Sequence, residues 1–174
     1  MTIEVREEAS GDIDAIEAIT KAAFQNAPYT SHTEHFIVNA LREAGELVVS
    51  LVAKVNGVVV GHVAISPVSV SDGVRGWFGL GPISVIPKQQ GRGIGSLLVR
   101  EALSHLRARG ASGCVVLGEP AFYQRFGFKN ESGLVLRDVP PEYFQASVFE
   151  LPVPHGTVAY SEAFDAQENP NHRA

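Results

Sequence analysis

The feature that most restricts how this chain can fold is the segment Val85 to Ser96, which joins a β-rich run to the clearest amphipathic helix. Three of its residues are alternating glycines: Gly91, Gly93 and Gly95. Glycine has no Cβ, so the backbone here can come close to a ligand. A helix N-terminus offers unpaired N–H groups and partial positive charge, which together favour phosphate. With Lys88 and Arg92 nearby, the segment predicts a phosphate site. A tight turn into a helix is the alternative.

The elements on either side of this segment agree with a phosphate site. Before it, residues 77–86 are typical of a strand, although three residues interrupt a regular ladder: Gly79, Gly81 and Pro82. They predict a bulge or the close approach of a ligand. After it, residues 91–109 predict a helix that Gly110 ends. Its apolar stripe consists of Ile94, Leu97, Leu98, Ala102 and Leu106.

The rest of the chain predicts a mixed α+β fold. Asn56-Gly57 joins two β-rich runs, 47–55 and 58–70, as a hairpin turn would. Further strands are predicted over 3–7, 113–117, 149–153 and 157–163. Helices are predicted from Gly11 to a break at Pro28, and over 31–44, 120–126 and 141–146. This order indicates a largely antiparallel sheet that becomes parallel where helix 91–109 crosses over.

Length and composition fit one soluble domain over residues 1–166, with a frayed polar tail over 167–174. No apolar run approaches the roughly 20 residues of a membrane span, and the acidic N-terminus lacks the apolar core of a secretory signal. A lone cysteine, Cys114, permits no internal disulfide, sits in an apolar run and is predicted to be core. A cytoplasmic location is therefore expected. The net charge of -5 argues against a nucleic-acid partner.

The glycine pattern distinguishes among the known phosphate loops. A dinucleotide-binding fingerprint needs glycine at position 96, where this chain has Ser96, and a Walker A loop needs Gly-Lys-Ser/Thr, which is absent. The run Gln90-Gly-Arg-Gly-Ile-Gly95, preceded by Val-x-Pro, instead resembles the pyrophosphate loop of the GNAT superfamily of N-acetyltransferases. A second motif follows the next predicted strand, Leu117-Gly-Glu-Pro-Ala-Phe-Tyr-Gln-Arg-Phe-Gly-Phe128. It is similar to one in a group of small bacterial N-acetyltransferases.

The resemblance implies a fold, a cofactor and a set of site residues. The fold would be three-layered, with a central, twisted, mostly antiparallel sheet that is splayed at the cofactor site and flanked by helices. The cofactor would be acetyl-CoA or coenzyme A as co-substrate, with no metal. Backbone groups of Ile83 and Val85 would bind the pantetheine arm. The pyrophosphate would lie on N–H groups of Gln90, Gly91, Arg92, Gly93, Ile94, Gly95 and Ser96. Tyr123 would lie near the cofactor sulfur, with Phe122 and Phe126 packed beside it.

The general base is not determined by the sequence. An amine acceptor is mostly protonated at neutral pH, so some group must take its proton. The strand over 77–85, where some members of the family carry a glutamate, has neither an acid nor a histidine. The candidates are Glu119, which could equally cap a short helix, and Glu34, His32 and His35. His62 lies in a strand pattern that is more typical of the core.

These observations predict an acyltransferase that moves acetyl from acetyl-CoA to a primary amine, directly and in a ternary complex. The acceptor would be a small molecule or a peptide, with no nucleic-acid or membrane partner. The alternative is a non-catalytic acetyl-CoA sensor, and a longer acyl donor is a third interpretation. The resemblance also leaves room for a homodimer.

Overall fold

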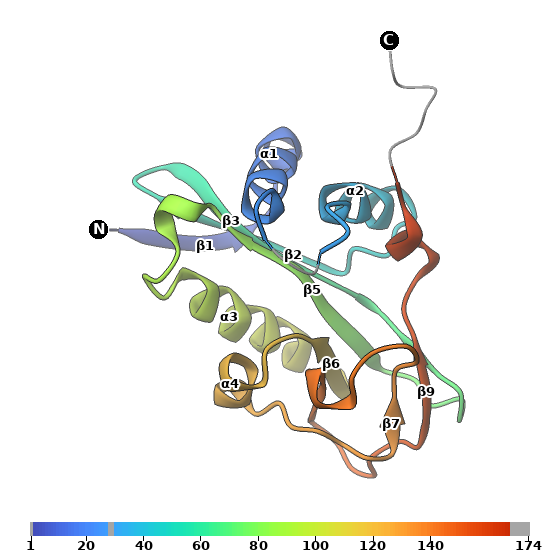
Figure 1. Cartoon of the computed structure of the whole chain (residues 1–174). Helices are drawn as coiled ribbons and strands as arrows, with labels where there is room; N and C mark the ends of the chain where they lie inside the picture. Colours follow the sequence, from blue (N-terminus) through green and yellow to red (C-terminus); the bar gives the residue numbers. More distant parts are fainter. Residues whose placement is uncertain (1, 28–29, 168–174) are drawn as a thin grey trace.

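A six-stranded, mostly antiparallel sheet forms the centre of the molecule (Figure 1). The computed structural model describes residues 2–27 and 30–167. The helix break expected at Pro28 and nearly all of the tail expected at 167–174 lie outside these residues. In spatial order the strands are β1 (Ile3–Glu7), β2 (Val49–Val55), β3 (Val58–Pro67), β5 (Trp77–Val85), β6 (Gly113–Leu117) and β8 (Phe144–Val148). Among the strand pairs of this sheet, as far as the described residues show it, β5–β6 is the parallel one and the other four are antiparallel. The predicted change of direction is therefore confirmed.

The parallel pair is explained by α3 (Ile94–Ala108), because a parallel connection needs a crossover element. The hairpin between β2 and β3 turns at Asn56 and Gly57, whose φ angles are 50° and 81°. Such positive values are what this turn requires and what these two residue types tolerate. The local chemistry of the turn therefore explains why β2 and β3 are antiparallel neighbours.

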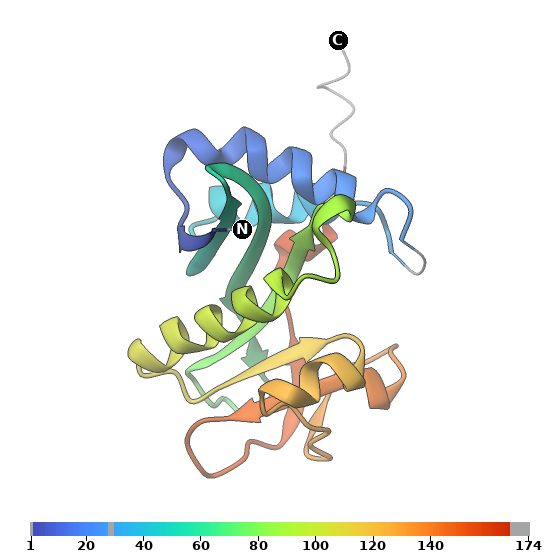
Figure 2. The same ribbon diagram turned by 90° about the vertical axis from the view of Figure 1, so that its left-hand side faces the viewer.

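Helices cover both faces of the sheet and complete three layers (Figures 1 and 2). On one face lie α1 (Ile13–Phe24), which follows a short 3-10 turn at Ser10–Asp12, and α2 (Glu34–Glu43). Ile16 and Val38 of these helices pack against Val52 of β2. On the other face, α3 buries Leu98 and Leu106 completely, in one cluster with Leu51 and Ile65 of the sheet. The predicted fold class is confirmed.

A second, small sheet closes one end of the molecule. Its order is β4 (Ser69–Val70), β9 (Gly156–Ala159) and β7 (Leu134–Val135). The sequence pattern did not predict it, because two-residue strands carry no periodic signal. After β9 the chain enters a short 3-10 turn, Glu162–Asp165, in which Ser161 accepts a hydrogen bond from the Ala163 N–H. Phe164 lies in this turn, which packs against α2, and Tyr160 lies just before the turn.

Three C-terminal predictions differ from the structure. The helix expected over 141–146 is a 3-10 turn at Pro141–Tyr143, because the next residues pair with β6 as β8. No strand forms over 149–153: the N–H groups of Phe149 and Glu150 both donate to the Ser112 carbonyl, so the chain turns there. The strand expected over 157–163 ends at Ala159.

Two helices begin three residues later than the pattern predicted. The α2 helix begins at Glu34 rather than residue 31, because His32 has a φ of 58° and therefore cannot belong to a right-handed helix. The α3 helix begins at Ile94 rather than residue 91, because Gly91 and Gly93 also have positive φ. Both differences place extra loop beside the cavities described below. The short helix expected over 120–126 is α4 (Pro120–Tyr123) followed by a 3-10 turn, Gln124–Phe126.

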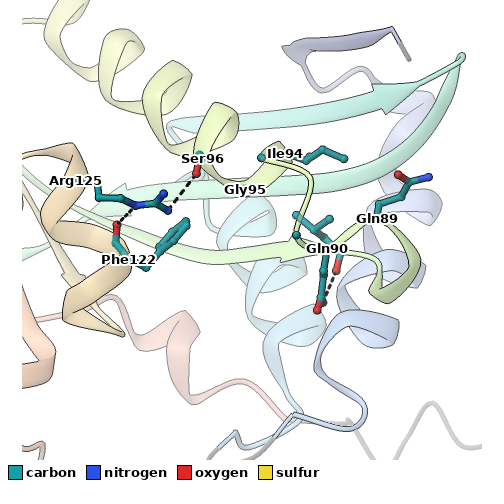
Figure 3. Close-up of a pocket in the computed structure, with 10 residues that line it drawn as sticks. Gln89, Gln90, Ile94, Gly95, Ser96, Phe122 and Arg125 are labelled. Carbon is teal, nitrogen blue, oxygen red and sulfur yellow. Dashed lines mark hydrogen bonds between the residues drawn. The ribbon is translucent and has the colours of Figure 1, made fainter.

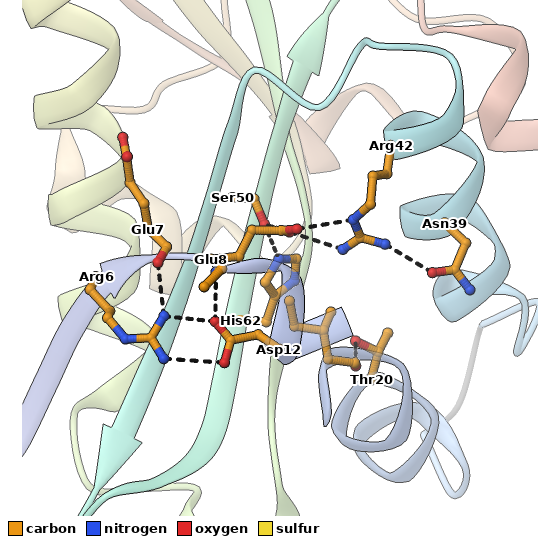
Figure 4. Close-up of polar contacts among 11 residues, drawn as sticks. Arg6, Glu7, Glu8, Asp12, Thr20, Asn39, Arg42, Ser50 and His62 are labelled. Carbon is orange, nitrogen blue, oxygen red and sulfur yellow. Dashed lines mark hydrogen bonds and ion pairs between the residues drawn. The ribbon is translucent and has the colours of Figure 1, made fainter. Parts of the chain in front are cut away.

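A buried polar cluster ties β1, β2, β3 and α2 together (Figure 4). Arg42 makes a two-point ion pair with Glu8, at 2.9 and 3.0 Å. The Ser50 hydroxyl donates to Glu8, and its oxygen lies 2.7 Å from His62 Nε2. Because that hydroxyl has one hydrogen, Nε2 of His62 must be the donor. His62 is a core residue, as predicted, and burial lowers its pKa to about 4.

This histidine should make folding stability depend on pH. Its folded pKa of about 4 lies below the ordinary histidine value of 6.5, so between these pH values the unfolded chain binds more protons. Stability should therefore rise with pH across this window, by about 2 kcal/mol between pH 5 and 7. Urea unfolding of the wild-type chain and of His62→Gln at both pH values measures how much His62 contributes to the pH dependence of the free energy of unfolding. An equal pH dependence in the two proteins would contradict it.

Candidate active site

The start of α3 borders a cavity, together with the loop before it and the segment that contains Phe122 and Arg125 (Figure 3). Gly93 takes the N-cap position with a φ of 82°, and no side chain caps the helix. A Cβ built on Gly91 or Gly93 would meet nothing within 4 Å. The N–H groups at this end have no carbonyl one turn earlier to bind, so they and the helix dipole remain available to an anion.

These residues form one wall of a cavity of about 450 Å³. It is lined by Val85, Gln89, Gln90, Gly91, Gly93, Ile94, Gly95, Ser96, Phe122 and Arg125. Arg125 is the basic member of this set. Its guanidinium donates to Ser96 Oγ at 3.3 Å and to the Phe122 carbonyl at 3.2 Å, and lies 4.9 Å from the centre of the Phe122 ring. A cation is thus held beside the free end of the helix.

The next strand, β5, has an open edge that leads away from this cavity. Its pairing with β6 ends at Leu80, although β5 continues to Val85. A register shift of one residue opposite β3 falls at Gly81 and Pro82, which confirms the predicted bulge. The Ile86 N–H donates to the Val60 carbonyl of β3. Since alternate residues face alternate neighbours in an antiparallel ladder, Ile83 and Val85 turn their backbone groups to the open side.

The Gln90 side chain lies across the top of this edge. Its Nε2 donates to the Val85 carbonyl at 2.9 Å, so it fixes the loop to the end of the strand (Figure 3). The Val85 carbonyl therefore already has a partner. For a ligand that runs along the strand, the Val85 N–H and the Ile83 backbone are the remaining contacts.

A second cavity, of about 430 Å³, lies further along the same strand. Its lining comes from both helix layers, from β5 and from the C-terminal turn: Phe24, Ser31, Glu34, Ile37, Leu80, Gly81, Pro82, Ile83, Leu117, Tyr123, Leu136, Tyr160 and Phe164. Ile83 lines this cavity and Val85 the first one. Two residues along a strand span roughly 7 Å, so the two cavities are neighbours.

Adjacent residues of α4 face the two cavities. Phe122 lines the first and Tyr123 the second. Tyr123 is 7% exposed, and burial raises its pKa to about 12. A Cβ on Gly118 would lie 2.4 Å from the tyrosine ring, so the glycine makes room for the ring in this position. The phenol is therefore a neutral hydrogen-bond donor at any physiological pH.

The four candidate bases lie in different places. Glu34 lines the second cavity, whereas Glu119 is exposed at the N-cap of α4 and lines neither cavity. His32 and His35 line a separate, smaller cavity of about 170 Å³. The Nδ1 atom of His32 lies 2.8 Å from the Phe24 carbonyl, and burial lowers the pKa of His35. Only Glu34 among them shares a cavity with Tyr123.

Four further residues do not line either cavity. Phe126 is buried, with its ring 5.2 Å from that of Phe122 and 5.2 Å from the Arg100 guanidinium carbon. Lys88 and Arg92 are not among the residues that line the first cavity. Cys114 has no exposed surface, and burial raises the pKa of its thiol, so it is a core residue as predicted.

Two features are absent from the described residues. Within residues 2–27 and 30–167, histidine, cysteine and acidic side chains nowhere gather in a group of three that could hold a metal ion. None of the helices in this part of the chain is long and apolar enough to cross a membrane.

Comparison with known proteins identifies the family. Residues 13–128 match the model of the acetyltransferase (GNAT) family, and this range contains both motifs quoted above. The chain belongs to the GNAT family. The N-acetyltransferase YhbS of Escherichia coli K12, whose function is uncharacterised, is 39% identical over 126 residues, which is 72% of each chain.

Two solved GNAT structures resemble this one over nearly its whole length. A GNAT family acetyltransferase from Brucella melitensis, in complex with acetyl-CoA, is 45% identical, with a TM-score of 0.84 over 94% of this chain and 99% of that one. Escherichia coli YhbS, in complex with CoA, is 35% identical, with a TM-score of 0.86 over 94% and 92%. The family predicted from the two motifs is thus confirmed.

The GNAT motifs did not reveal every residue that lines the cavities. Arg125 was part of a quoted motif but had no assigned role, and its position beside Ser96 depends on how α4 packs against α3. The aromatic walls of the second cavity, Phe24, Tyr160 and Phe164, lie far apart in the sequence. No local pattern marks them, because only the tertiary fold brings them together.

Proposed function

We propose that this chain transfers an acetyl group from acetyl-CoA to a primary amine, directly and in a ternary complex. The observation that carries this proposal is that two cavities adjoin along the open edge of β5. One is bordered by an uncapped helix N-terminus and Arg125, and the other contains the Tyr123 ring. This arrangement suits a ligand with phosphates at one end and a reacting group at the other.

The residues present fit acetyl-CoA, and the two similar solved structures are complexes with acetyl-CoA and with CoA. When bound, this co-substrate supplies a thioester whose acyl carbon accepts an amine. The N–H groups from Gly91 to Ser96 would hold its pyrophosphate, whereas the Gln90 N–H already donates to the Pro87 carbonyl, and Arg125 would add charge. The backbone of Ile83 and Val85 would bind the pantetheine arm. Phe122 would pack on the arm from the first cavity, with Phe126 supporting Phe122 from behind.

Direct transfer is favoured because the described residues offer no good nucleophile in the second cavity. The thiol of Cys114 is buried, with a raised pKa. The reaction must remove two protons from an ammonium acceptor. A base takes the first proton and leaves a neutral amine. The amine then forms the C–N bond while the C–S bond breaks. The second proton leaves the nitrogen, and the thiolate sulfur receives a proton. Tyr123 would donate a hydrogen bond to that sulfur.

Glu119 is a second candidate for the base, and it would act through a water molecule. It is exposed and lies outside the cavity, so it would reach the amine only through water. A cytoplasmic location and a homodimer also stay predictions.

The test begins with calorimetric titration of the purified chain, freed of bound ligand, with acetyl-CoA. A micromolar Kd, near -8 kcal/mol, is the expected result. Thiol release is then followed with a panel of primary amines. No binding by the folded chain would overturn the proposal. Binding without thiol release from acetyl-CoA or longer acyl donors, across the whole panel, would instead indicate the sensor.

A further inference from the structure

We propose that Glu34 receives the ammonium group of the acceptor, and that the acceptor is a monoamine with an apolar body, such as an arylalkylamine. This inference rests on the proposed function and adds the substrate class. The residues that carry it are Glu34 and the walls of the second cavity.

Glu34 has a carboxylate oxygen that lacks a partner. Its Oε2 atom is buried and makes no hydrogen bond with any residue that the structure describes. Leaving a buried carboxylate oxygen unpaired is costly, so such an atom is expected to meet a partner from outside the chain. Glu34 lies in the first turn of α2, where the helix dipole favours a negative charge. The complementary ligand is therefore a cation.

The surroundings of Glu34 are mainly apolar. Eight of the cavity residues have hydrocarbon or phenyl side chains or are proline: Phe24, Ile37, Leu80, Pro82, Ile83, Leu117, Leu136 and Phe164. The polar side chains are those of Ser31, Glu34, Tyr123 and Tyr160. Among these lining residues Glu34 is the charged one, and none is lysine, arginine or histidine. The cavity thus offers one negative charge in an apolar enclosure.

A single carboxylate in an apolar cavity favours some classes of amine over others. A free amino acid would bring its own carboxylate into a cavity whose lining has no cation to receive it. A diamine or polyamine would bury a second ammonium without a second carboxylate, and an aminoglycoside would bury many hydroxyl groups. A monoamine with a hydrocarbon body satisfies Glu34 and fills the remainder. A cavity of about 430 Å³ is within the range of small-molecule sites.

One wall of the cavity depends on a glycine of β5. A Cβ on Gly79 would lie 2.5 Å from the ring of Tyr160, so the ring packs directly on the strand backbone. The Tyr160 ring also packs against that of Phe164, with ring centres 4.9 Å apart and the ring planes tilted by 57°. Burial raises the pKa of Tyr160, so this wall stays uncharged. These aromatic rings would contact the body of the acceptor, while Glu34 and Tyr123 border the space for its nitrogen.

The test measures amine binding separately from turnover. The chain is saturated with CoA, which has no acyl group to transfer, and is titrated with 2-phenylethylamine, butane-1,4-diamine and phenylalanine. The same titrations are made on Glu34→Gln and on Glu43→Gln, a control at the exposed C-terminal end of the same helix. Acetyl-CoA binding is measured on every protein.

We expect 2-phenylethylamine to bind at least tenfold more tightly than the other two compounds. Glu34→Gln should weaken it at least 30-fold, with the acetyl-CoA Kd unchanged within twofold, whereas Glu43→Gln should behave as wild type. In a series of n-alkylamines, kcat/KM should rise about fourfold per methylene until the cavity is full.

Several outcomes would overturn this inference alone. They are an unchanged amine affinity in Glu34→Gln, a preference for the diamine or the amino acid, and a higher kcat/KM for a terminally blocked lysine peptide. The last would indicate protein acceptors. If the wild-type chain fails to bind acetyl-CoA, the proposed function fails first, so the two failures are distinguishable.

Discussion

The Gly93→Glu variant is expected to bind acetyl-CoA at least 100-fold more weakly than the wild-type chain. Gly93 forms the N-cap of α3, and the space around its Cβ position is open. A glutamate there would place a carboxylate where the helix end and Arg125 favour the phosphates of the cofactor. Like charges within a few ångströms of each other oppose binding strongly when water is partly excluded. Calorimetric titration measures the change.

The backbone strain of this substitution needs its own control. Gly93 has a φ of 82°, and any side chain in this region costs about 1 to 2 kcal/mol. Gly110 follows the other end of α3 with a φ of 78°, and it too is exposed with open space around its Cβ position. Gly110→Glu should therefore suffer similar strain and still bind acetyl-CoA as wild type does.

A second comparison separates charge from size. Gly93→Gln has nearly the same volume as Gly93→Glu but no charge, and we expect it to retain more of the affinity. Equal losses in these two variants would assign the effect to steric exclusion. Full affinity in Gly93→Glu would show that the phosphates do not lie at the start of α3.

The Tyr123→Phe variant is expected to lose 100-fold or more in kcat while its Kd for acetyl-CoA changes less than twofold. The substitution keeps the ring, which packs against Phe122 and Phe128 with centres 4.9 and 5.8 Å apart, so the fold should not change. Only the hydroxyl is removed. A group that acts on the leaving sulfur affects the transition state and not the bound ground state.

The pKa of this tyrosine also limits how it can act. Full transfer of a proton from a phenol of pKa about 12 to a thiolate of pKa about 8.5 is unfavourable by roughly 5 kcal/mol. Tyr123 is therefore better suited to donate a hydrogen bond to the developing thiolate, which accepts its proton from the amine nitrogen. For the same reason, deprotonation of Tyr123 should not lower kcat at any pH below about 11.

Stopped assays of thiol release, with the amine and acetyl-CoA concentrations varied separately, measure the loss of kcat in Tyr123→Phe. Tyr143→Phe is the matched control, since Tyr143 is 40% exposed and lines neither cavity. If Tyr123→Phe turns over at the wild-type rate, the tyrosine is a packing residue whose hydroxyl has no catalytic role.

The structure around the start of α3, where we propose that phosphate binds, was predictable because it depends on local features of the sequence. Gly91, Gly93 and the uncapped start of α3 lie within a few consecutive residues, so the sequence shows both the backbone freedom and the helix end. The bulge at Gly81 and Pro82 was predictable for the same reason. These features depend on residues that are neighbours in the chain.

The second cavity, where we propose that the acceptor binds, was not predictable, because packing brings its residues together from distant parts of the sequence. Glu34 was one of four candidate bases. The local sequence around it does not indicate that one of its carboxylate oxygens is buried. Tyr160 lies 81 positions beyond Gly79 (160 minus 79), yet the two are in contact. Phe144 to Ala146 have a local pattern that fits a helix, but pairing with β6 makes them a strand. In each case a contact between distant segments decides the outcome.

The early end of the β5–β6 pairing has a consequence for how the molecule unfolds. One part of the structure is built on β1, β2 and β3, and the other on β6 and β8. In the described part of the six-stranded sheet, the pairing that joins them runs from Trp77 to Leu80 of β5 and from Gly113 to Val116 of β6, and the small sheet adds the β4–β9 pair. A pantetheine arm along the open edge of β5 would act as a temporary strand. It would add hydrogen bonds to the part of β5 beyond Leu80, which does not pair with β6. The two parts would then unfold more cooperatively, so that the co-substrate becomes a structural member of the domain for as long as it is bound.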